Sequence, residues 1–200
     1  DKDKIKAFYG GGGWLDADLK STIQFSPDKT KMFIKIVVEE GERYHVGATN
    51  ITGNKLFTDS EIQEILELKK GDPFLPETFQ KDTQNIKNSY GSQGYVNTVV
   101  KASHKYSQDN PEVDITYDIE EKERIFIEKI IISGNDKTKD NVIRRELLFY
   151  PGEILDTEKI SISQQRLVNT GFFDNICQLY RSNANSRQCP LKDISVKPPE

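Results

Sequence analysis

The sequence has few of the residues that metal sites, redox centres and proton-transfer catalysts use. Its 200 residues include only two cysteines, two histidines, one methionine and one tryptophan. The cysteines do not form a Cys-x-x-Cys pair, which argues against redox catalysis. His45 and His104 lack a cysteine or carboxylate cluster at ligand spacing, so we expect no metal site, no cofactor and no catalytic residue.

Long hydrophobic runs and an excess of positive charge are also lacking. No apolar run is longer than a few residues, and a membrane-spanning helix needs about 20. The 28 lysines and arginines stand against 32 acidic residues, for a net charge of −4. Nucleic acid is therefore disfavoured as a partner, because binding by counterion release needs a basic face.

The sequence does contain an internal repeat. Gly53-Asn54 ends one strand-like segment and Gly134-Asn135 ends another, an offset of 134 − 53 = 81 residues. The same offset relates Gly71 to Gly152, and Gly13-Trp14 to Gly94-Tyr95. A period of domain length indicates units that each bury a small core of their own.

Hydrophobic periodicity and capping signals predict the order β-α-α-β-β within one repeat. The predicted elements are a strand over 44–52, a helix opened by the capping box Thr58–Glu61 and closed by Lys69-Lys70-Gly71, a helix from Pro76 to Tyr90, and strands over Tyr95–Ala102 and Val113–Ile119. Strict alternation in the last strand indicates one packed and one wet face. We expect an α+β fold of tandem βααββ units, each a three-stranded mixed sheet covered by two helices.

Three segments follow from this repeat. Residues 1–42 carry a helix and a hairpin (Leu19–Phe25 and Met32–Val38), the C-terminal part of a unit. Residues 43–121 form a complete unit. Residues 122–200 form another, with a strand over 125–133, helices over Thr138–Phe149 and from Asp156 to Asn169, and strands over Asn175–Tyr180 and Asp193–Lys197.

These units resemble the POTRA (polypeptide-transport-associated) domain. The resemblance is carried by Gly53-Asn54 and its repeat, by Tyr-Gly-x-x-Gly-Tyr at Tyr90–Tyr95, and by the acidic-Gly segment Glu39-Glu40-Gly41. It covers essentially the whole chain. Ile143-Arg144-Arg145-Glu146, followed by Gly171-Phe172-Phe173, is similar to the last such domain before a membrane barrel in outer-membrane assembly factors.

The resemblance implies a periplasmic arm that receives unfolded outer-membrane β-barrel proteins and passes them to its own C-terminal barrel, which this chain lacks. An edge strand presents unpaired N–H and C=O groups to any extended chain. The family's second strand is such an edge, which implies client contact at Leu19–Phe25, at Tyr95–Ala102 and at Asn175–Tyr180. The predicted client residues are Leu19, Ile23, Phe25, Tyr95, Val96, Thr98, Val100 and Ala102.

The family also implies docking of accessory lipoproteins, for which Arg144, Arg145 and Glu146 are the candidates. The resemblance implies an acidic residue immediately before Gly152, but this sequence has Pro151 there. The identity of the accessory partner, or the way it docks, could therefore differ from that in the family. The alternative for the same three residues is a solvated helix face with i,i+4 pairing.

Cys177 and Cys189 lie almost symmetrically about Asn183, so a hairpin could place them opposite each other. A disulfide would suit an oxidising periplasm; the alternative is two free thiols.

Three rival interpretations remain for the whole chain. The arm could be a scaffold that spaces accessory subunits without client contact, or it could belong to a two-partner secretion transporter. A division protein with one such domain is disfavoured by the tandem units. Gly10–Gly13 is not a phosphate loop, because it follows a helix and precedes a strand.

Overall fold

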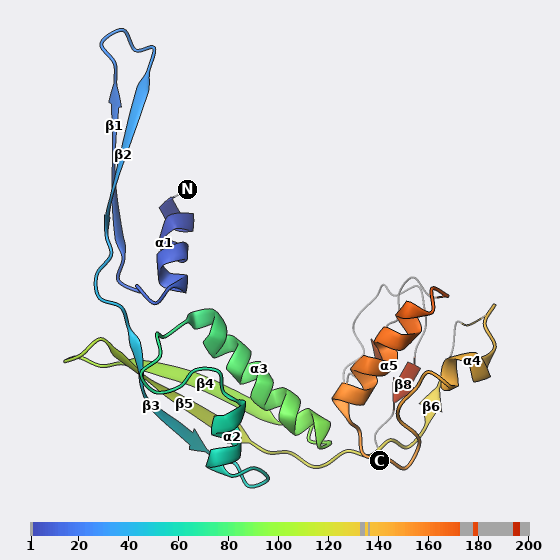
Figure 1. Ribbon diagram of the computed structural model, residues 1–200. Coiled ribbons are helices and arrows are strands. Elements are labelled where there is room, and N and C mark those ends of the chain that lie inside the picture. Colours follow the sequence, from blue (N-terminus) through green and yellow to red (C-terminus); the bar gives the residue numbers. More distant parts are fainter. Residues whose placement is uncertain (1, 133–134, 136, 173–177, 180–193, 197–200) are drawn as a thin grey trace. The chain divides into compact units, whose positions relative to one another are not determined.

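The computed structural model describes residues 2–132, 135, 137–172, 178–179 and 194–196. The chain divides into two compact units. Unit 1 comprises residues 1–86 with 100–119, and unit 2 comprises residues 87–99 with 120–200. Each unit is described by itself below, with the element labels of Figure 1.

Unit 1 begins with helix α1 (Lys2–Gly11) and the hairpin of β1 (Asp18–Phe25) and β2 (Met32–Glu39). The two strands pair antiparallel from Asp18↔Glu39 to Phe25↔Met32. The turn is closed by the Lys29 N–H, which donates to the Ser26 carbonyl at 2.8 Å. The predicted helix and hairpin are both confirmed, although α1 runs through Gly10 and Gly11 before it ends.

The rest of unit 1 has the predicted βααββ order. Its elements are β3 (His45–Thr52), α2 (Asp59–Ile65), α3 (Pro76–Ser92), β4 (Val99–Tyr106) and β5 (Glu112–Glu120). The sheet order is β3-β5-β4, with β3 parallel to β5. In Figure 1, α3 runs across the sheet formed by β3, β4 and β5. Helix α2 starts at the predicted capping box: the Thr58 hydroxyl accepts from the Glu61 N–H, and the Glu61 side chain accepts from the Thr58 N–H.

The core of unit 1 lies on one face of β5. Val113, Ile115, Tyr117 and Ile119 are buried, whereas Asp114 and Asp118 are exposed. The period-two pattern therefore places the apolar residues as predicted. Ile62 of α2 and Ile86 of α3, with Phe74 from the segment between these helices, are also fully buried.

A buried side chain stops the first helix of each repeat. Both oxygens of Asp82, on α3, accept backbone N–H groups, from Glu67 at 2.7 Å and from Leu68 at 3.0 Å. Ser163 lies 81 residues later, and its Oγ accepts from the Leu148 N–H at 2.8 Å. These bonds turn the chain out of the helix, so α2 ends at Ile65 rather than near Lys69-Lys70-Gly71, as the sequence predicted.

Unit 2 contains β6 (Ile130–Ile131), α4 (Asp140–Arg144), α5 (Thr157–Asn169), β7 (Gln178–Leu179) and β8 (Ile194–Val196). Asp156 caps α5, as predicted, by accepting from the Glu158 and Lys159 N–H groups. The core is a cluster of eight buried residues: Ile125, Ile127, Ile130, Ile143, Leu147, Phe149, Leu155 and Leu167.

Several predicted boundaries are wrong. The strand predicted over Tyr95–Ala102 is β4, which starts four residues later and continues to Tyr106, because Tyr95–Thr98 form a turn in which the Thr98 N–H donates to the Tyr95 carbonyl. The helix predicted over Thr138–Phe149 is α4, which ends at Arg144. The described residues of β7 and β8 pair parallel, so the antiparallel hairpin assumed for Cys177 and Cys189 is not found; both cysteines lie outside the described residues.

Candidate functional site

The two outer strands of the unit 1 sheet differ in how much of their backbone is already paired. Residues 44 and 46 direct their backbone groups away from β5, because the intervening His45 N–H donates to Pro111 on the β5 side. The Tyr44 carbonyl accepts from the Phe74 N–H at 2.9 Å, and Val46 exchanges hydrogen bonds with Gly71 and Asp72 at 2.8 Å each. The segment Gly71–Phe74 therefore covers the outer edge at the start of β3.

A bulge interrupts β3 immediately after this covered stretch. The register with β5 shifts between Val46 and Thr49, and the Asp114 carboxylate accepts from the Ala48 N–H at 2.7 Å. Bulges weaken an edge as a template for another strand. On β3, only residues 48–52 follow the bulge.

Unit 2 repeats this coverage. Ile127 donates to the Glu153 carbonyl at 2.8 Å and accepts from the Gly152 N–H at 2.7 Å, while the Ile125 carbonyl accepts from Leu155. Gly71 and Gly152 adopt positive φ angles, +88° and +90°. The glycine that follows the first helix thus turns the chain back over residues 44–46 in one repeat and over residues 125–127, which precede β6, in the other.

Strand β4 has an eight-residue edge that is not covered in this way. Among the described residues, β4 pairs with β5 alone. Val100 and Ala102, two of the predicted client residues, lie in β4, whereas Tyr95, Val96 and Thr98 precede it. The face that Val100 and Ala102 share continues to His104 and Tyr106, which the sequence reasoning did not select.

An aromatic cluster flanks the far end of β4. It consists of Tyr44, Phe74, Phe79, His104 and Tyr106. The His104 ring lies 5.3 Å from Phe74, 5.5 Å from Phe79 and 5.3 Å from Tyr106, and Tyr106 lies 5.4 Å from Tyr44. These are ordinary distances for interacting rings. His104 and Tyr106 are exposed, so the cluster presents aromatic surface beside the uncovered edge. The period-two alternation of residues 100–106 could have predicted that His104 and Tyr106 share a face with Val100 and Ala102.

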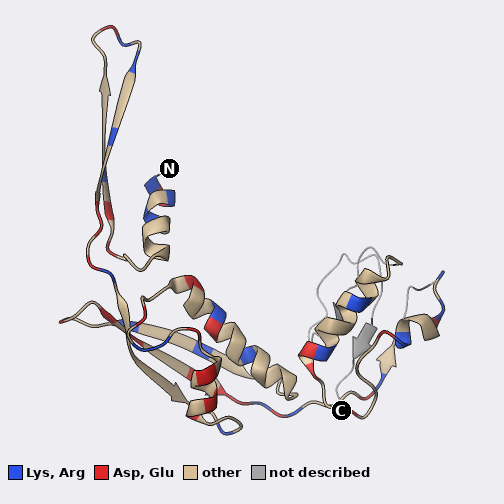
Figure 2. Cartoon of the chain, in the orientation of Figure 1, with Lys and Arg blue, Asp and Glu red and all other residues tan. Residues whose placement is uncertain are grey.

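The opposite face of β4 is charged. Lys101 and Lys105 are exposed there. Figure 2 colours the positions of basic and acidic residues along the ribbon, and both kinds occur along the chain. Lysines on an edge strand disfavour pairing between identical edges. The two lysines therefore disfavour pairing between two copies of β4, while the backbone N–H and C=O groups of the edge remain available to another strand.

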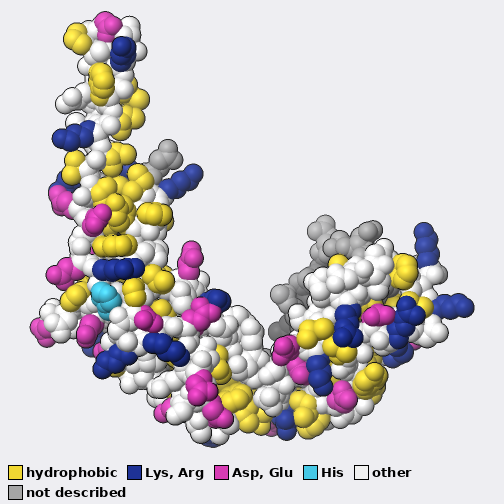
Figure 3. Space-filling view, viewed as in Figure 1, with side chains coloured by type: hydrophobic (Ala, Val, Ile, Leu, Met, Phe, Trp, Pro, Cys, Tyr) yellow, Lys and Arg dark blue, Asp and Glu magenta, His cyan; other side chains and the backbone are white. Residues whose placement is uncertain are grey.

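The predicted client residues Leu19, Ile23 and Phe25 lie in β1, which within the described residues pairs only with β2. Hydrophobic side chains line this hairpin on the face seen in Figure 3. Ile23, Phe25 and Phe33 are 55–64 % exposed. In the predicted strand Asn175–Tyr180, only Gln178 and Leu179 are described, and they form the outer strand β7 of the order β6-β8-β7.

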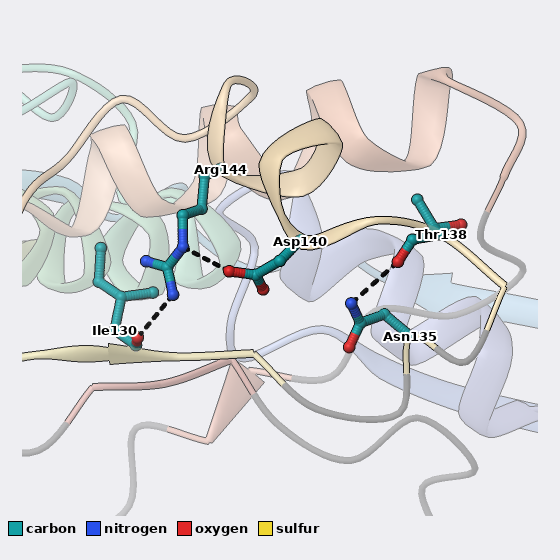
Figure 4. Close-up of polar contacts among 5 residues, drawn as sticks. All are labelled: Ile130, Asn135, Thr138, Asp140 and Arg144. Atoms are coloured by element: carbon teal, nitrogen blue, oxygen red, sulfur yellow. Dashed lines mark hydrogen bonds and ion pairs between the residues drawn. The ribbon is translucent and has the colours of Figure 1, made fainter.

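The structure separates the three predicted docking residues. Arg144 donates through Nε to Asp140 at 2.7 Å, an i,i+4 pair, and through Nη2 to the Ile130 carbonyl at 3.3 Å (Figure 4). Arg145 pairs with its neighbour Glu146 at 3.0 Å, and its side chain is 65 % exposed. Both arginine side chains are exposed, 45 % for Arg144 and 65 % for Arg145, but Arg144 is bound to the backbone of another segment and Arg145 to its neighbour.

The Gly-Asn signature has a local structural explanation. Asn54 donates to the Phe57 carbonyl at 2.9 Å and to Asp59 at 2.7 Å, and Asn135 donates to the Thr138 carbonyl at 2.9 Å (Figure 4). In both repeats the asparagine holds the loop that leads into the first helix.

The described residues contain no cluster of three or more metal-ligating side chains. The search for a long apolar helix over the same part of the chain found none that could cross a bilayer.

Comparison with known proteins identifies the repeated unit. The family model for POTRA, described as "Surface antigen variable number repeat", matches residues 44–122 and 125–187. The chain therefore belongs to the POTRA family.

More particularly, it is similar to the POTRA part of outer-membrane protein assembly factors. It is 33 % identical over 178 residues to the outer membrane protein assembly factor BamA of Neisseria meningitidis, which covers 88 % of this chain and 22 % of that protein. The chain thus spans about a fifth of the length of this relative.

Two solved structures share the fold. The crystal structure of POTRA domains 3–5 of Haemophilus influenzae BamA has a TM-score of 0.65 at 24 % identity, over 98 % of this chain and 76 % of that one. BamA of Haemophilus ducreyi lacking POTRA domains 1–3 has a TM-score of 0.60 at 26 % identity, over 76 % of this chain and 28 % of that one.

Proposed function

We propose that this chain is a receptor arm that binds unfolded outer-membrane β-barrel proteins by strand addition, chiefly at β4. The observation that carries this proposal is the contrast between the outer strands: β3 is covered by Gly71–Phe74 and bulged, whereas β4 pairs only with β5 among the described residues. Backbone pairing tolerates many client sequences, and the aromatic cluster supplies apolar contact for alternate side chains.

The relatives support the setting of this activity. POTRA domains of BamA are the periplasmic part of an outer-membrane protein, and this chain matches that part. The arm would act without turnover or cofactor and would hand its clients to a membrane barrel. The open edge of β4 favours client binding over a pure scaffold, and the similarity to BamA favours an assembly factor over the arm of a two-partner secretion transporter.

Proline substitutions in β4 test the proposal. Lys101→Pro and Ala102→Pro each remove one N–H, and the N–H groups of consecutive strand residues point to opposite sides. The variant that loses the outward N–H should keep its circular dichroism spectrum and lose crosslinking to an unfolded outer-membrane barrel protein. The inward variant should lose the β4–β5 pairing and unfold locally.

A proline at Asn50, in the part of β3 after the bulge, is the matched control and should leave crosslinking near the wild-type level. Full crosslinking by both folded β4 variants would favour the scaffold alternative.

We also propose that Arg145, with Glu146, docks an accessory lipoprotein, whereas Arg144 is structural. Arg145→Ala should weaken capture of a purified accessory lipoprotein without changing the melting temperature. Arg144→Ala should lower the melting temperature, because the Ile130 carbonyl and Asp140 lose their shared partner. Equal loss of capture in both variants at unchanged stability would contradict this division of roles.

The domain boundaries 1–42, 43–121 and 122–200 remain a proposal. Support comes from β2, whose Met32, Ile34 and Ile36 lie 81 residues before Val113, Ile115 and Tyr117. The former are 53 %, 57 % and 44 % exposed and the latter 0 %, 1 % and 0 %. Residues 1–42 thus have the apolar face of a unit without the helix and strand that cover it in the next repeat. Fusing a strand and a helix equivalent to β3 and α2 to the N-terminus should protect the Ile34 and Ile36 amides from hydrogen exchange.

A further inference from the structure

Two link segments, residues 39–44 and 120–125, make the same contacts 81 residues apart. The first set of contacts lies within unit 1 and the second within unit 2. Both links are short and charged, with the sequences Glu39-Glu40-Gly41-Glu42-Arg43-Tyr44 and Glu120-Glu121-Lys122-Glu123-Arg124-Ile125. Joints of this composition are flexible unless specific contacts restrain them.

An arginine restrains each link in the same way. Arg43 donates through Nε to the Gly12 carbonyl at 2.9 Å, and Arg124 donates through Nε to the Gln93 carbonyl at 2.9 Å. The guanidinium of Arg43 lies 4.7 Å from the centre of the Trp14 ring, and that of Arg124 lies 5.9 Å from the centre of the Tyr95 ring. A planar guanidinium can stack on a ring and donate at its edge at the same time, which an ammonium group cannot do.

Backbone and tyrosine contacts accompany each arginine. The Tyr44 N–H donates to the Gly13 carbonyl at 2.9 Å, and the Ile125 N–H donates to the Gly94 carbonyl at 2.9 Å. The Tyr90 hydroxyl donates to Glu121 at 2.8 Å. In the first link the Glu40 carboxylate raises the pKa of Tyr9.

Glycine precedes the aromatic residue in both repeats because the backbone there is left-handed. Gly94 has a φ of +89°, and a Cβ there would lie 2.5 Å from Ile154 and 3.1 Å from Arg124. Gly13 has a φ of +96°, and a Cβ there would lie 3.4 Å from Arg43. This accounts for the glycine that precedes the aromatic residue in both repeats.

From these contacts we propose that Arg43 and Arg124 are positioning residues of a repeated latch. Each latch consists of the arginine, the ring beneath it (Trp14 or Tyr95) and the carbonyl that it binds. It fixes a charged link to the helix end of the preceding repeat, and so limits bending where one repeat meets the next. The two latches have different rings, but in both the arginine binds a backbone carbonyl. The side chain of the residue that supplies this carbonyl, Gly12 or Gln93, therefore does not matter for the hydrogen bond.

Electron-spin distance measurements on the whole chain test the latch. Nitroxide labels introduced as unnatural amino acids leave Cys177 and Cys189 unmodified. Labels at Thr22 and Lys101 report on the first latch within unit 1, and labels at Lys87 and Ser161 report on the second within unit 2. Arg43→Ala should broaden the first distance distribution and leave the second unchanged, and Arg124→Ala should do the reverse.

Hydrogen exchange supplies a local readout. Loss of the arginine should raise the exchange rate of the Tyr44 or Ile125 amide by about tenfold, the size expected for one cation–π contact and one charge-assisted hydrogen bond. Arg→Lys should behave like Arg→Ala because a lysine cannot make both contacts. Trp14→Tyr should retain the latch, since Tyr95 serves in the second repeat, and Trp14→Leu should lose it.

Arg166→Ala, a change at an exposed position on α5, is the matched control and should alter neither readout. The proposal is overturned if Arg43→Ala and Arg124→Ala leave both distance widths and amide exchange unchanged, or if Arg166→Ala changes them equally. Circular dichroism would identify an arginine variant that unfolds. The comparison of Trp14→Tyr with Trp14→Leu would then test the latch, and equal distance widths and amide exchange in these two variants would overturn it. None of these outcomes depends on client binding.

Discussion

The carbonyl oxygen of Ile119 lies 2.1 Å from the position that a Cβ on Gly53 would occupy. Gly53 also has a φ of +81°, a left-handed conformation that other residues adopt at a cost. Two independent constraints, the backbone angle and the lack of space, therefore fix glycine at the end of β3.

Gly53→Ala should lower the free energy of unfolding of the chain by about 3 kcal/mol, because the backbone oxygen cannot move aside without breaking the sheet. Gly71→Ala is the matched comparison. Its φ is +88°, but a Cβ there meets nothing within 4 Å, so only the backbone strain of about 1 kcal/mol applies. Urea unfolding measures both, and equal losses would contradict the steric explanation.

Asp82 should contribute more to stability than its counterpart Ser163. The Asp82 carboxylate is fully buried and accepts two backbone N–H groups, whereas the Ser163 hydroxyl accepts one. Asp82→Ala should cost about 3 kcal/mol, since both donors lose a charged acceptor, and Ser163→Ala about 1 kcal/mol. Asp82→Ser should recover part of the loss. Thermal unfolding of the three variants checks the order.

The Tyr117 hydroxyl is buried and has no hydrogen-bond partner among the described residues. Removing a buried polar group that has no partner costs little. Tyr117→Phe should therefore leave the free energy of unfolding within about 1 kcal/mol of wild type or raise it. Tyr90→Phe should lower it, because the bond to Glu121 is lost.

The same tyrosine gives a prediction for alkaline pH. Burial, assisted by the negative charge of Asp82, raises the pKa of Tyr117 above its usual value of 10.0. The unfolded chain therefore loses this proton at a lower pH than the folded chain. The contribution of Tyr117 is complete below pH 10 and is lost as the pH rises toward the folded pKa. Tyr117→Phe should flatten the decline of stability above pH 10, and an unchanged slope would show that Tyr117 is not responsible.

Mass measurement after alkylation, with and without reductant, tests the pairing of Cys177 with Cys189. A disulfide blocks both alkylations until reductant is added. The bridge would close a loop of about a dozen residues and stabilise the chain by about 3 kcal/mol in the entropic model. Two alkyl groups added without reductant would establish free thiols.

Local signals predicted the parts of the fold that local interactions determine. The capping box at Thr58, the N-cap at Asp156 and the alternation along β5 depend on residues close in sequence, and all three are confirmed. The end of α2 depends on Asp82, a side chain from a different helix, and no pattern near Leu66 reveals it. The start of β4 was missed because Tyr95 and Val96 favour strands intrinsically, although the Tyr95 ring lies instead beneath Arg124.

The candidate site was predicted less completely than the fold. No sequence pattern distinguishes the two outer strands, because the coverage of β3 depends on a turn that lies after α2. Arg144 and Arg145 are neighbours of the same type, and only the structure distinguishes the one bound to the Ile130 carbonyl from the one paired with its neighbour Glu146.

The turn that folds back over the first strand determines how many edges of a repeat's sheet stay open to another strand. Because Gly71–Phe74 covers the start of the β3 edge, β4 has the longer uncovered side of that sheet, and under the proposed function an incoming polypeptide would lie there. The number of acceptor sides would then grow in step with the number of repeats.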